Sequence, residues 1–567
     1  MKTRMNTKKF DIRVLNSSKD KSIKQILIEN RRIQDVEKFF NPDMMYLHDV
    51  GSVSGIFESA KLVLEHIRLG SKIFIHGDYD VDGICSTAIL WSFLYRYHKA
   101  NVVPIIPDRF VDGYGLSENT VQKMIDGGAS LIITVDCGVK DVEIISKYSS
   151  KVDFIITDHH KMIQADLLDQ YKESEVIKIG QNLIPSKAKA VVHPKLYNTD
   201  LEICGAFVAW DLCRAINELK PGVDMDQYLD LVALATVCDL MPIVGDNRII
   251  VKKGLEQCRK TTNAGIRAIC EVAKINLEEI DVYHLAFVIG PIINASGRIE
   301  NAMVALRLLC TLDLVAAKSL AIKLNNLNKI RQGLTLKYFR EAEMKLHQDQ
   351  NKVKFVYGDD WPEGIVGLIA SRIAEKYRCP AIVGSLKKGQ VKASARSLEG
   401  IDILELIRRS SSYLIKFGGH ALAAGLMIDE KKIEPFLDNV NKEFEKLNYK
   451  IDENQQILVD TELKLDDVDF KLFEDVSQFA PFGYGNPQPQ FLVRNIPKPT
   501  EYQKMGENHF KTKLHYSTPL DILGFDLIED LEMAGEVLDL VFTLEKNQKA
   551  EGKRLVLKLK ALQTACN

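Results

Sequence analysis

Four side chains that can bind a metal ion lie within seven residues near the start of the chain: His76, Asp78, Asp80 and Asp82. They follow the apolar segment 72–75 directly. Carboxylates this close together repel one another and raise one another's pKa unless a cation neutralises them. We therefore predict that divalent metal ions bind here and that the chemistry is metal-assisted hydrolysis.

The same aspartates also match the start of a calcium-binding EF-hand loop. Such a loop needs a bidentate glutamate at its twelfth position and a helix before its first ligand. Counted from Asp78, the twelfth position is Ile89, and the preceding segment is predicted to be a strand. The sequence therefore disfavours a calcium sensor.

Further ligand-type side chains follow other apolar segments: Asp136, His159, His160 and Asp239. Asp136 comes after the predicted strand 131–135, the two histidines after a strand that begins near residue 154, and Asp239 after the apolar run 231–238. The carboxyl ends of parallel strands share one edge of a sheet. We expect these side chains to meet the first cluster in one pocket.

Carboxylates and imidazoles without thiolates suit manganese or magnesium better than zinc. The ten cysteines include no Cys-x-x-Cys pair, so the sequence predicts neither a zinc knuckle nor a disulfide framework. Two such ions, about 3.5–4 Å apart, suit phosphodiester hydrolysis, because one activates a water and both stabilise the charged transition state. We predict two ions, Mn²⁺ or Mg²⁺.

The elements that would position these ligands alternate between strand and helix, as in a doubly wound α/β domain with a parallel sheet. The predicted strands are 72–75, 102–106, 131–135 and 154–156. Segment 301–347 has no proline and only Gly333 as a helix breaker, which predicts a long connecting helix.

A smaller α/β lobe is predicted next, with a helix at 366–377, a strand at 381–383 and a glycine-rich turn at 417–420. From about residue 455, strand-like runs predict a small β-barrel. We divide the chain into an N-terminal extension (1–50), a first α/β domain (51–300), connecting helices (301–348), a second α/β domain (349–450) and the barrel (451–567).

Basic and glycine-rich segments form a second group of candidates, with Arg109, Arg298, Ser394, Arg396 and His420. Arginine binds phosphate bidentately, and small residues let backbone amides approach an anion. Each segment by itself fits an ordinary turn or a surface ion pair equally well, so both interpretations stay open at this point.

The formal net charge of −2 neither favours nor excludes nucleic acid. The longest apolar run, 231–238, is far shorter than the ~20 residues that span a bilayer. No signal-peptide core follows the basic N-terminus, so we expect a cytoplasmic protein with no membrane segment.

Together these motifs resemble the DHH phosphoesterase superfamily and, more closely, the RecJ single-strand-specific exonucleases. The segments 76–83, 135–138, 157–160 and 235–239 are similar to the four phosphoesterase motifs in order. Further similar segments are 297–298, 324–332, 393–397, 418–425 and 481–491, the last resembling the entry to an OB domain. The similarity covers residues 50–567.

The resemblance implies roles for the candidate ligands. His76 and Asp80 would hold one metal ion, and Asp82, His159 and Asp239 the other. Asp136 would bridge the two ions. His160 and Asp78 would complete the catalytic set beside the ions, either near the scissile phosphate or in contact with the metal ligands.

The family also implies a 5′-phosphate pocket, formed here by Arg109, Arg298, Ser394 and Arg396, with His420 facing the active site from the second lobe. It implies 5′→3′ removal of mononucleotides from single-stranded DNA in repair and recombination. The substrate would be supplied by a helicase or a single-strand-binding protein. The sequence departs from the family at Ile292 and Pro362, where relatives carry arginine and histidine, which puts phosphate contacts there in question.

Two other functions are compatible with parts of the pattern. A DHH phosphodiesterase of short oligonucleotides or cyclic dinucleotides would use the same ligands, but the OB-like segment opposes it. A non-catalytic single-strand-binding replication subunit would need no metal ligands, and the complete ligand set argues against that.

Overall fold

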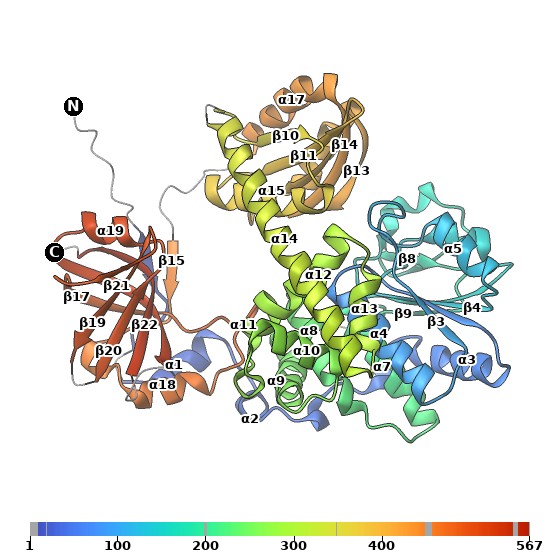
Figure 1. The fold of residues 1–567 in the computed structure, drawn as a ribbon, viewed down its shortest axis with the longest axis horizontal. Helices are drawn as coiled ribbons and strands as arrows, with labels where there is room; N and C mark the ends of the chain where they lie inside the picture. The colour runs from blue at the N-terminus through green and yellow to red at the C-terminus, as the bar shows by residue number, and fades with distance from the viewer. Residues whose placement is uncertain are drawn as a thin grey trace. The chain divides into compact units, whose positions relative to one another are not determined.

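The structure is a computed structural model that describes residues 10–18, 20–197, 201–347, 349–447, 456–516, 518–547 and 554–565 (Figure 1). The chain forms two compact units. One consists of 47–241 and 250–451, and the other of 1–46, 242–249 and 452–567. Among the described residues, no helix is long and apolar enough to cross a membrane.

A five-stranded parallel sheet forms the centre of the first α/β domain, in the order β3-β2-β4-β5-β9. Its strands are β2 (Ile73–His76), β3 (Val102–Ile105), β4 (Leu131–Val135), β5 (Asp153–Thr157) and β9 (Ala190–Val192). Each of the four strands predicted from the sequence is present within one residue of its predicted start. β2 and β4 are buried along their whole length, as expected for strands covered on both faces.

Helices cover both faces of this sheet, which makes it doubly wound (Figure 1). α5 (Glu118–Asp126) and α6 (Val142–Tyr148) pack on one face, where Val121 and Ile145 join the core with Phe74 and Phe154. The other face is covered by α3 (Ile56–Arg68), α4 (Val81–Arg96) and α7 (Gly205–Leu219), and α8 (Leu229–Cys238) packs on α4. A three-stranded antiparallel sheet, β6-β8-β7 (Ile163–Gln164, Asn182–Pro185, Val176–Ile179), is inserted after β5.

Helices connect the two α/β domains. They are α9 (Gly245–Arg259), α10 (Ala264–Ala273), α11 (Val282–His284), the π-helical turn η6 (Leu285–Ile289), α12 (Gly290–Ile299), α13 (Met303–Cys310) and α14 (Leu314–Leu346). The predicted long connecting helix is present as α14, but it begins at Leu314, because the chain breaks at 311–313 after α13. Asp313 starts α14 there by accepting hydrogen bonds from the amides of Val315 and Ala316.

The second α/β domain contains a five-stranded sheet in the order β10-β11-β12-β14-β13, with α15 (Glu363–Tyr377), α16 (Ile403–Arg409) and α17 (Ile433–Lys446). The strands are β10 (Lys354–Asp359), β11 (Ala381–Lys387), β12 (Gln390–Arg396), β13 (Leu414–His420) and β14 (Ala423–Asp429). The predicted glycine-rich turn at 417–420 is wrong. These residues form the end of β13, because Gly418 and Gly419 pair with Gly425 and Ala424 of β14.

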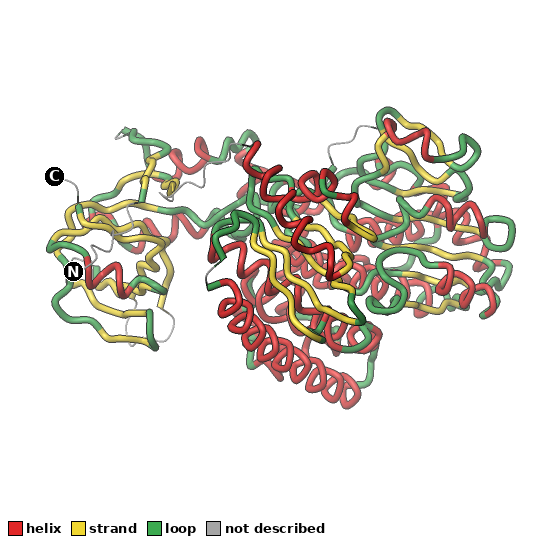
Figure 2. The backbone as a smooth tube through the Cα atoms, turned by 90° about the horizontal axis from the view of Figure 1, so that it is seen from above, coloured by secondary structure: helices red, strands yellow, loops and turns green. Residues whose placement is uncertain are grey.

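The other unit is built mainly of strands (Figure 2). Its seven-stranded sheet has the order β16-β17-β21-β22-β20-β19-β18. The strands are β16 (Thr461–Glu462), β17 (Phe491–Pro497), β18 (Gln503–Met505), β19 (His509–His515), β20 (Pro519–Gly524), β21 (Val537–Asn547) and β22 (Arg554–Thr564). No pairing joins the two outer strands among the described residues, so closure of the predicted barrel is not established.

The N-terminal segment belongs to this strand-rich unit. β1 (Asp11–Val14) pairs in parallel with β15 (Gln456–Val459), and α1 (Ile23–Asn30) packs near α18 (Phe470–Ser477). α2 (Val36–Phe40) and α19 (Ile528–Met533) complete its helices of five or more residues within the described chain. Residues predicted as a separate extension thus contribute to the same core as residues more than 400 positions later.

The buried Arg248 ties these distant segments together. Its guanidinium donates hydrogen bonds to the carbonyl oxygens of Phe39, Phe479 and Ala480 and lies 3.7 Å from the ring centroid of Phe39. Burial lowers the pKa of Arg248 to about 10, so the side chain stays charged at neutral pH.

Replacing Arg248 with alanine should destabilise this unit by about 3 kcal/mol or more, because several buried carbonyls lose their donor at once. The loss is measurable as faster amide hydrogen exchange of β17 and β21 in urea. Arg13→Ala, an exposed arginine of the same unit, is the control and should leave exchange unchanged. Equal protection in both variants would contradict the assigned role.

Candidate metal centre

The predicted ligands meet at the carboxyl edge of the parallel sheet, where the strand order reverses. The chain leaves β2 for β3 on one side and later returns to β4 on the other side of β2. His76 ends β2, Asp80 is the N-cap of α4, and Asp136 follows β4. This reversal point is where open α/β sheets bind their ligands.

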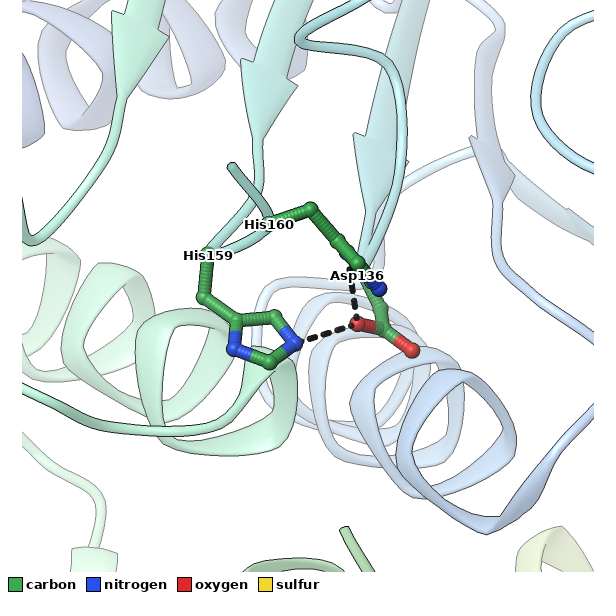
Figure 3. Close-up of side chains that lie close together, drawn as sticks. All are labelled: Asp136, His159 and His160. Carbon is green, nitrogen blue, oxygen red and sulfur yellow. Dashed lines mark ion pairs between the residues drawn. The ribbon is translucent and has the colours of Figure 1, made fainter. Parts of the chain in front are cut away.

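Asp136 lies at the centre of the cluster. Its backbone has a φ of 62°, in the left-handed region that residues other than glycine rarely adopt. Such strain persists where the surrounding structure enforces it and is frequent at functional sites. Its Oδ1 lies 3.1 Å from Nε2 of His159 and 3.7 Å from Nδ1 of His160 (Figure 3).

Three overlapping groups of side chains place their ligand atoms within 4.8 Å of one another. They are Asp78, Asp80 and Asp136; Asp136, His159 and His160; and Asp82, His159 and Asp239. Asp136 and His159 each belong to two groups. The geometry therefore suits more than one cation with shared ligands.

Asp82 is held by the start of α7. The backbone amides of Gly205 and Ala206 donate to its two carboxylate oxygens at 2.6 and 2.7 Å. The positive end of a helix dipole stabilises a carboxylate in this position. Gly205 was not among the predicted site residues, because nothing in its local sequence indicates that α7 returns to the sheet edge.

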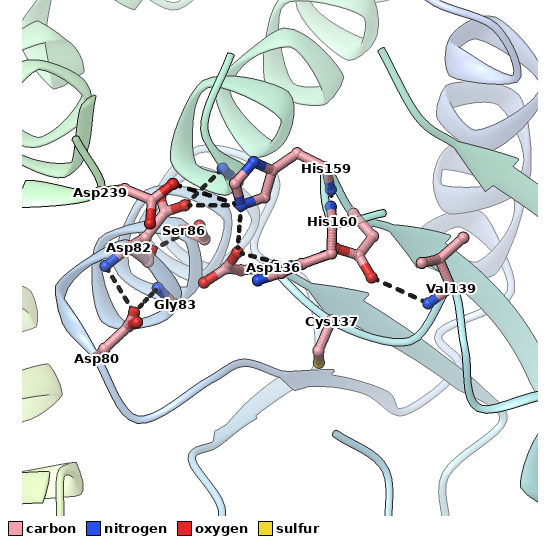
Figure 4. Close-up of polar contacts among 12 residues, drawn as sticks. Asp80, Asp82, Gly83, Ser86, Asp136, Cys137, Val139, His159, His160 and Asp239 are labelled. Carbon is pink, nitrogen blue, oxygen red and sulfur yellow. Dashed lines mark hydrogen bonds and ion pairs between the residues drawn. The ribbon is translucent and has the colours of Figure 1, made fainter. Parts of the chain in front are cut away.

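Asp158 orients the two histidines that follow it. The sequence placed it in the 157–160 motif but gave it no role of its own. Its Oδ1 accepts hydrogen bonds from the amides of His159 and His160 and lies 2.9 Å from Nδ1 of His160, while Oδ2 accepts from the amide of Val139. Figure 4 labels these three partners, His159, His160 and Val139. Burial opposes ionisation, but the hydrogen bonds and the nearby imidazoles lower the pKa of Asp158 below its usual range. Although burial acts in the opposite direction, Asp158 raises the pKa of His160 to about 9.

The other carboxylates repel one another. Burial and the neighbouring carboxylates raise the pKa of Asp78, Asp80 and Asp136, and they raise the pKa of Asp239 to about 8. Burial lowers the pKa of His159 and lowers that of His76 to about 4, so both rings are neutral as metal binding requires.

Buried polar atoms without a hydrogen-bond partner provide a direct test of whether metal ions fit. Such atoms include Nε2 of His76, Oδ1 of Asp78, Oδ1 of Asp136 and Nε2 of His159. An unpartnered buried polar atom is costly unless something else binds it. The cluster therefore fits divalent cations in both charge and donor type.

His76 lies somewhat apart from the other candidates. It is fully buried, and its Nδ1 is 3.6 Å from Sγ of Cys137, but its ring nitrogens belong to none of the three groups. Asp239 caps the end of α8, and its Oδ2 lies 3.6 Å from Nε2 of His159.

A second cluster contains the predicted phosphate-binding residues. Nη1 of Arg396 donates to Oγ of Ser394 at 2.9 Å, Arg298 donates to the carbonyl of Gly364 at 3.3 Å, and the guanidinium of Arg109 lies 4.9 Å from the ring centroid of Tyr79. Burial, followed by the charges of Arg109, Arg331 and Arg396, lowers the pKa of Arg298 to about 10.

Arg331 of α14 joins this cluster but was not predicted as a site residue. Its Nε donates to Oδ1 of Asn328 at 3.0 Å, and burial and the charge of Arg372 lower its pKa. Within the described residues, Arg109, Arg298, Arg331 and Arg396 form no ion pair with a carboxylate. Neighbouring guanidinium groups without counterions are suited to an anionic ligand.

His420 is exposed at the end of β13. Burial and the charges of Lys140, His160 and Lys161 lower its pKa, so it lies within electrostatic reach of the His160 side of the centre. At the two departures from the family pattern, Ile292 is buried within α12 and Pro362 is the N-cap residue of α15.

Three family models match the chain: the DHH family, N-terminal domain, over residues 72–236, the DHHA1 domain over 350–446 and the RecJ OB domain over 459–561. A parallel-sheet domain with an aspartate and histidine centre at its reversal point, followed by a DHHA1 domain, defines a DHH-type phosphoesterase.

Individual relatives narrow this class. The chain is 31% identical over 512 residues to the single-stranded-DNA-specific exonuclease RecJ of Haemophilus influenzae, and the match covers 85% of each protein. It is also 31% identical over 527 residues to RecJ of Bacillus subtilis, covering 90% of this chain and 64% of the relative, so it spans somewhat less than two thirds of that relative's length. The chain belongs to the RecJ family.

Solved structures agree with this assignment. The crystal structure of Thermus thermophilus RecJ in complex with Mn²⁺ matches with a TM-score of 0.81 and 26% identity, covering 96% of this chain and 76% of that one. The same protein in complex with Mg²⁺ matches with a TM-score of 0.76 and 26% identity, covering 98% and 79%.

Proposed function

We propose that this chain is a metal-dependent exonuclease that removes 5′-mononucleotides from single-stranded DNA in the 5′→3′ direction, in DNA repair and recombination. The observation that carries the proposal is the central Asp136, whose carboxylate belongs to two overlapping ligand groups. Relatives named as single-stranded-DNA-specific exonucleases and the Mn²⁺ and Mg²⁺ complexes of one of them support it.

Two divalent ions, Mn²⁺ or Mg²⁺, fit the donor atoms. In this assignment His76 and Asp80 hold one ion, Asp82, His159 and Asp239 hold the other, and Asp136 is shared. When bound, such ions polarise the scissile phosphate and lower the pKa of water.

The remaining residues of the catalytic set act on the substrate. Asp158 pairs with Nδ1 of His160 and keeps the ring protonated, which leaves the Nε2–H to donate to the developing negative charge on the phosphate. Asp78 is buried next to Asp80 and Asp136 and adds a third carboxylate to this side of the pocket.

The arginine cluster sets the polarity of degradation. Arg109, Arg298 and Arg396, with Ser394, bind a terminal 5′ phosphate, and His420 contacts the substrate from the second α/β domain. The unit that contains residues 459–561 binds the single strand by contacting the phosphate backbone and the bases of the DNA, as OB domains do. A helicase or a single-strand-binding protein supplies the substrate.

A polarity assay tests this proposal. Single-stranded oligonucleotides labelled at the 5′ or the 3′ end are incubated with the full chain and Mn²⁺, and the products are separated by size. We expect the 5′ label to appear first, as a mononucleotide. Release from the 3′ end, faster hydrolysis of dinucleotides, or tight strand binding without hydrolysis would each contradict the proposal.

Replacing Arg396 with alanine should weaken the preference for a 5′-phosphorylated strand over a 5′-hydroxyl strand by about tenfold or more, since a charge-assisted hydrogen bond contributes about 1.5–3 kcal/mol. The ratio of kcat/KM for the two substrates measures this preference. Arg408→Ala, in α16 of the same domain and paired with Glu405, should leave the ratio as in the wild type. An unchanged ratio in Arg396→Ala would remove Arg396 from the pocket.

A further inference from the structure

Two aromatic side chains, Tyr283 and Phe287, are exposed in the helical segment that follows α10. Their exposed fractions are 60% and 69%, and their ring centroids lie 5.3 Å apart with the ring planes inclined by 32°. Aromatic side chains usually bury most of their large apolar surface in a core or an interface. These two instead contact each other and present their remaining faces to solvent.

The backbone fixes this pair next to the metal centre. Phe287 lies in the π-helical turn η6, and Sγ of Cys238 approaches the carbonyl oxygen of Leu285 in the same turn at 3.6 Å. A Cβ added to Gly290, directly after the turn, would lie 2.4 Å from that sulfur, so the turn packs tightly on α8. The next residue after Cys238 is Asp239, a candidate metal ligand.

The residue next to Asp239 also exposes an apolar side chain. Leu240, directly after Asp239, is 67% exposed and has a φ of 55°. The carboxylate of Asp281, beside Tyr283, is already engaged by the amide and the ring of His284, with Nδ1 at 2.6 Å. Exposed apolar side chains are therefore present both beside Asp239 and on the segment 283–287, and the carboxylate of Asp281 already has a hydrogen-bond partner.

We propose that Tyr283 and Phe287 form a stacking platform for the bases of the single strand whose phosphates lie at the metal centre. The proposal deepens the proposed function and rests on it. A strand held by its backbone at Asp239 must place its bases on neighbouring surface. Aromatic rings bind bases of any sequence, because every base has a π-face. The packing of η6 on the end of α8, one residue from Asp239, favours nucleobases over a protein partner as the occupant, and π-helical turns are frequent at functional sites.

Steady-state kinetics on single-stranded DNA test the platform with the full chain and Mn²⁺. Phe287→Ala and Tyr283→Ala should each raise KM about tenfold and leave kcat within about twofold, because stacking binds the strand without touching the reacting atoms. Phe287→Trp should retain the wild-type KM, whereas Phe287→Leu should behave as Phe287→Ala, since leucine fills space but cannot stack.

The matched control is Tyr95→Ala. Tyr95 is also exposed and stacks on Trp91 with ring centroids 4.8 Å apart, but it lies in the last turn of α4, about 21 Å along the helix axis from its first residue, next to Asp80. Its KM should equal that of the wild type.

A substrate series separates stacking from a structural effect. Strands that carry a single abasic position are compared, one position at a time, in the wild type and in Phe287→Ala. At the position that faces the platform, the missing base should raise the wild-type KM about tenfold and leave the KM of Phe287→Ala unchanged. Equal sensitivity of both proteins at every position, or wild-type KM values in both alanine variants, would overturn the proposal.

These results are distinguishable from failure of the proposed function itself. If the wild type hydrolyses no single-stranded DNA, the exonuclease assignment fails. If the wild type degrades the strand and the aromatic variants do so with the same KM, only the platform fails.

Discussion

Replacing Asp136 with asparagine should reduce exonuclease activity by about a thousandfold or more, the scale expected when a preorganised electrostatic group is removed. The amide keeps the size of the side chain but cannot supply a charged, shared ligand to two cations. Asp136 is shared by two of the three ligand groups, so the substitution disturbs both positions at once.

The same variant should behave differently when stability is measured. Without metal, Asp136→Asn should be no less stable than the wild type, because it removes one of several carboxylates that repel one another in a buried cluster. Mn²⁺ should raise the melting temperature of the wild type, because it binds only the folded state, and should raise that of the variant much less. Activity and metal-induced stabilisation are thus lost together while the fold is kept.

The control for lost charge is Asp169→Asn, at an exposed position of the same domain, which should retain full activity and the full metal-induced shift. Wild-type activity in Asp136→Asn would exclude the centre described here as the site of hydrolysis.

A second large effect is expected from Gly205→Ala. A Cβ at this position would lie 2.6 Å from Cβ and 2.7 Å from Oδ1 of Asp136, closer than real side chains approach one another. Either α7 or the strained loop at Asp136 must move, and the two amides that hold Asp82 move with α7. A displacement of about 1 Å at a catalytic centre reduces the rate about a hundredfold.

Alanine favours helices over glycine by about 1 kcal/mol, so the loss in Gly205→Ala cannot come from helix propensity. The matched control is Gly333→Ala in the interior of α14, where an added Cβ meets no atom within 4 Å. It should raise stability slightly and leave the rate unchanged. The test measures the hydrolysis rate and the Mn²⁺-dependent melting temperature of both variants. Full activity in Gly205→Ala would show that the close packing of Gly205 on Asp136 is not needed for catalysis.

Much of the fold could be predicted, because the apolar segments of the sequence coincide with the strands that are buried in the structure. The parallel strands of the first domain read as short apolar runs, and a strand buried on both faces has no polar alternation to obscure it. The long connecting helix was predicted, but its start and the strand at 414–420 were not. The pattern gives no sign of the break at 311–313, where Asp313 caps α14, and the two glycines that suggest a turn are held extended by pairing with β14.

The candidate site also contains residues that the sequence predicted and residues that it did not. Asp78, Asp80, Asp136 and His159 were predictable because the end of a parallel strand is a fixed place in the sheet, so each ligand's position follows from its own strand. Gly205 and Arg331 were not, since their importance lies in their proximity to Asp136 and Arg298, 69 and 33 positions away, which no local pattern encodes. The role of Asp158 rests on the hydrogen bonds of its carboxylate to His159, His160 and Val139, which only the structure shows.

By itself, the sequence determined which chemistry is available: carboxylates and imidazoles at strand ends, without thiolates, that need divalent cations. Only the tertiary structure decided which of these side chains lie close enough to share an ion and which hold the others in place. The amides that fix Asp82, the strained backbone of Asp136 and the arginines without counterions arise when separate elements pack together, because packing alone brings distant parts of the chain within bonding distance.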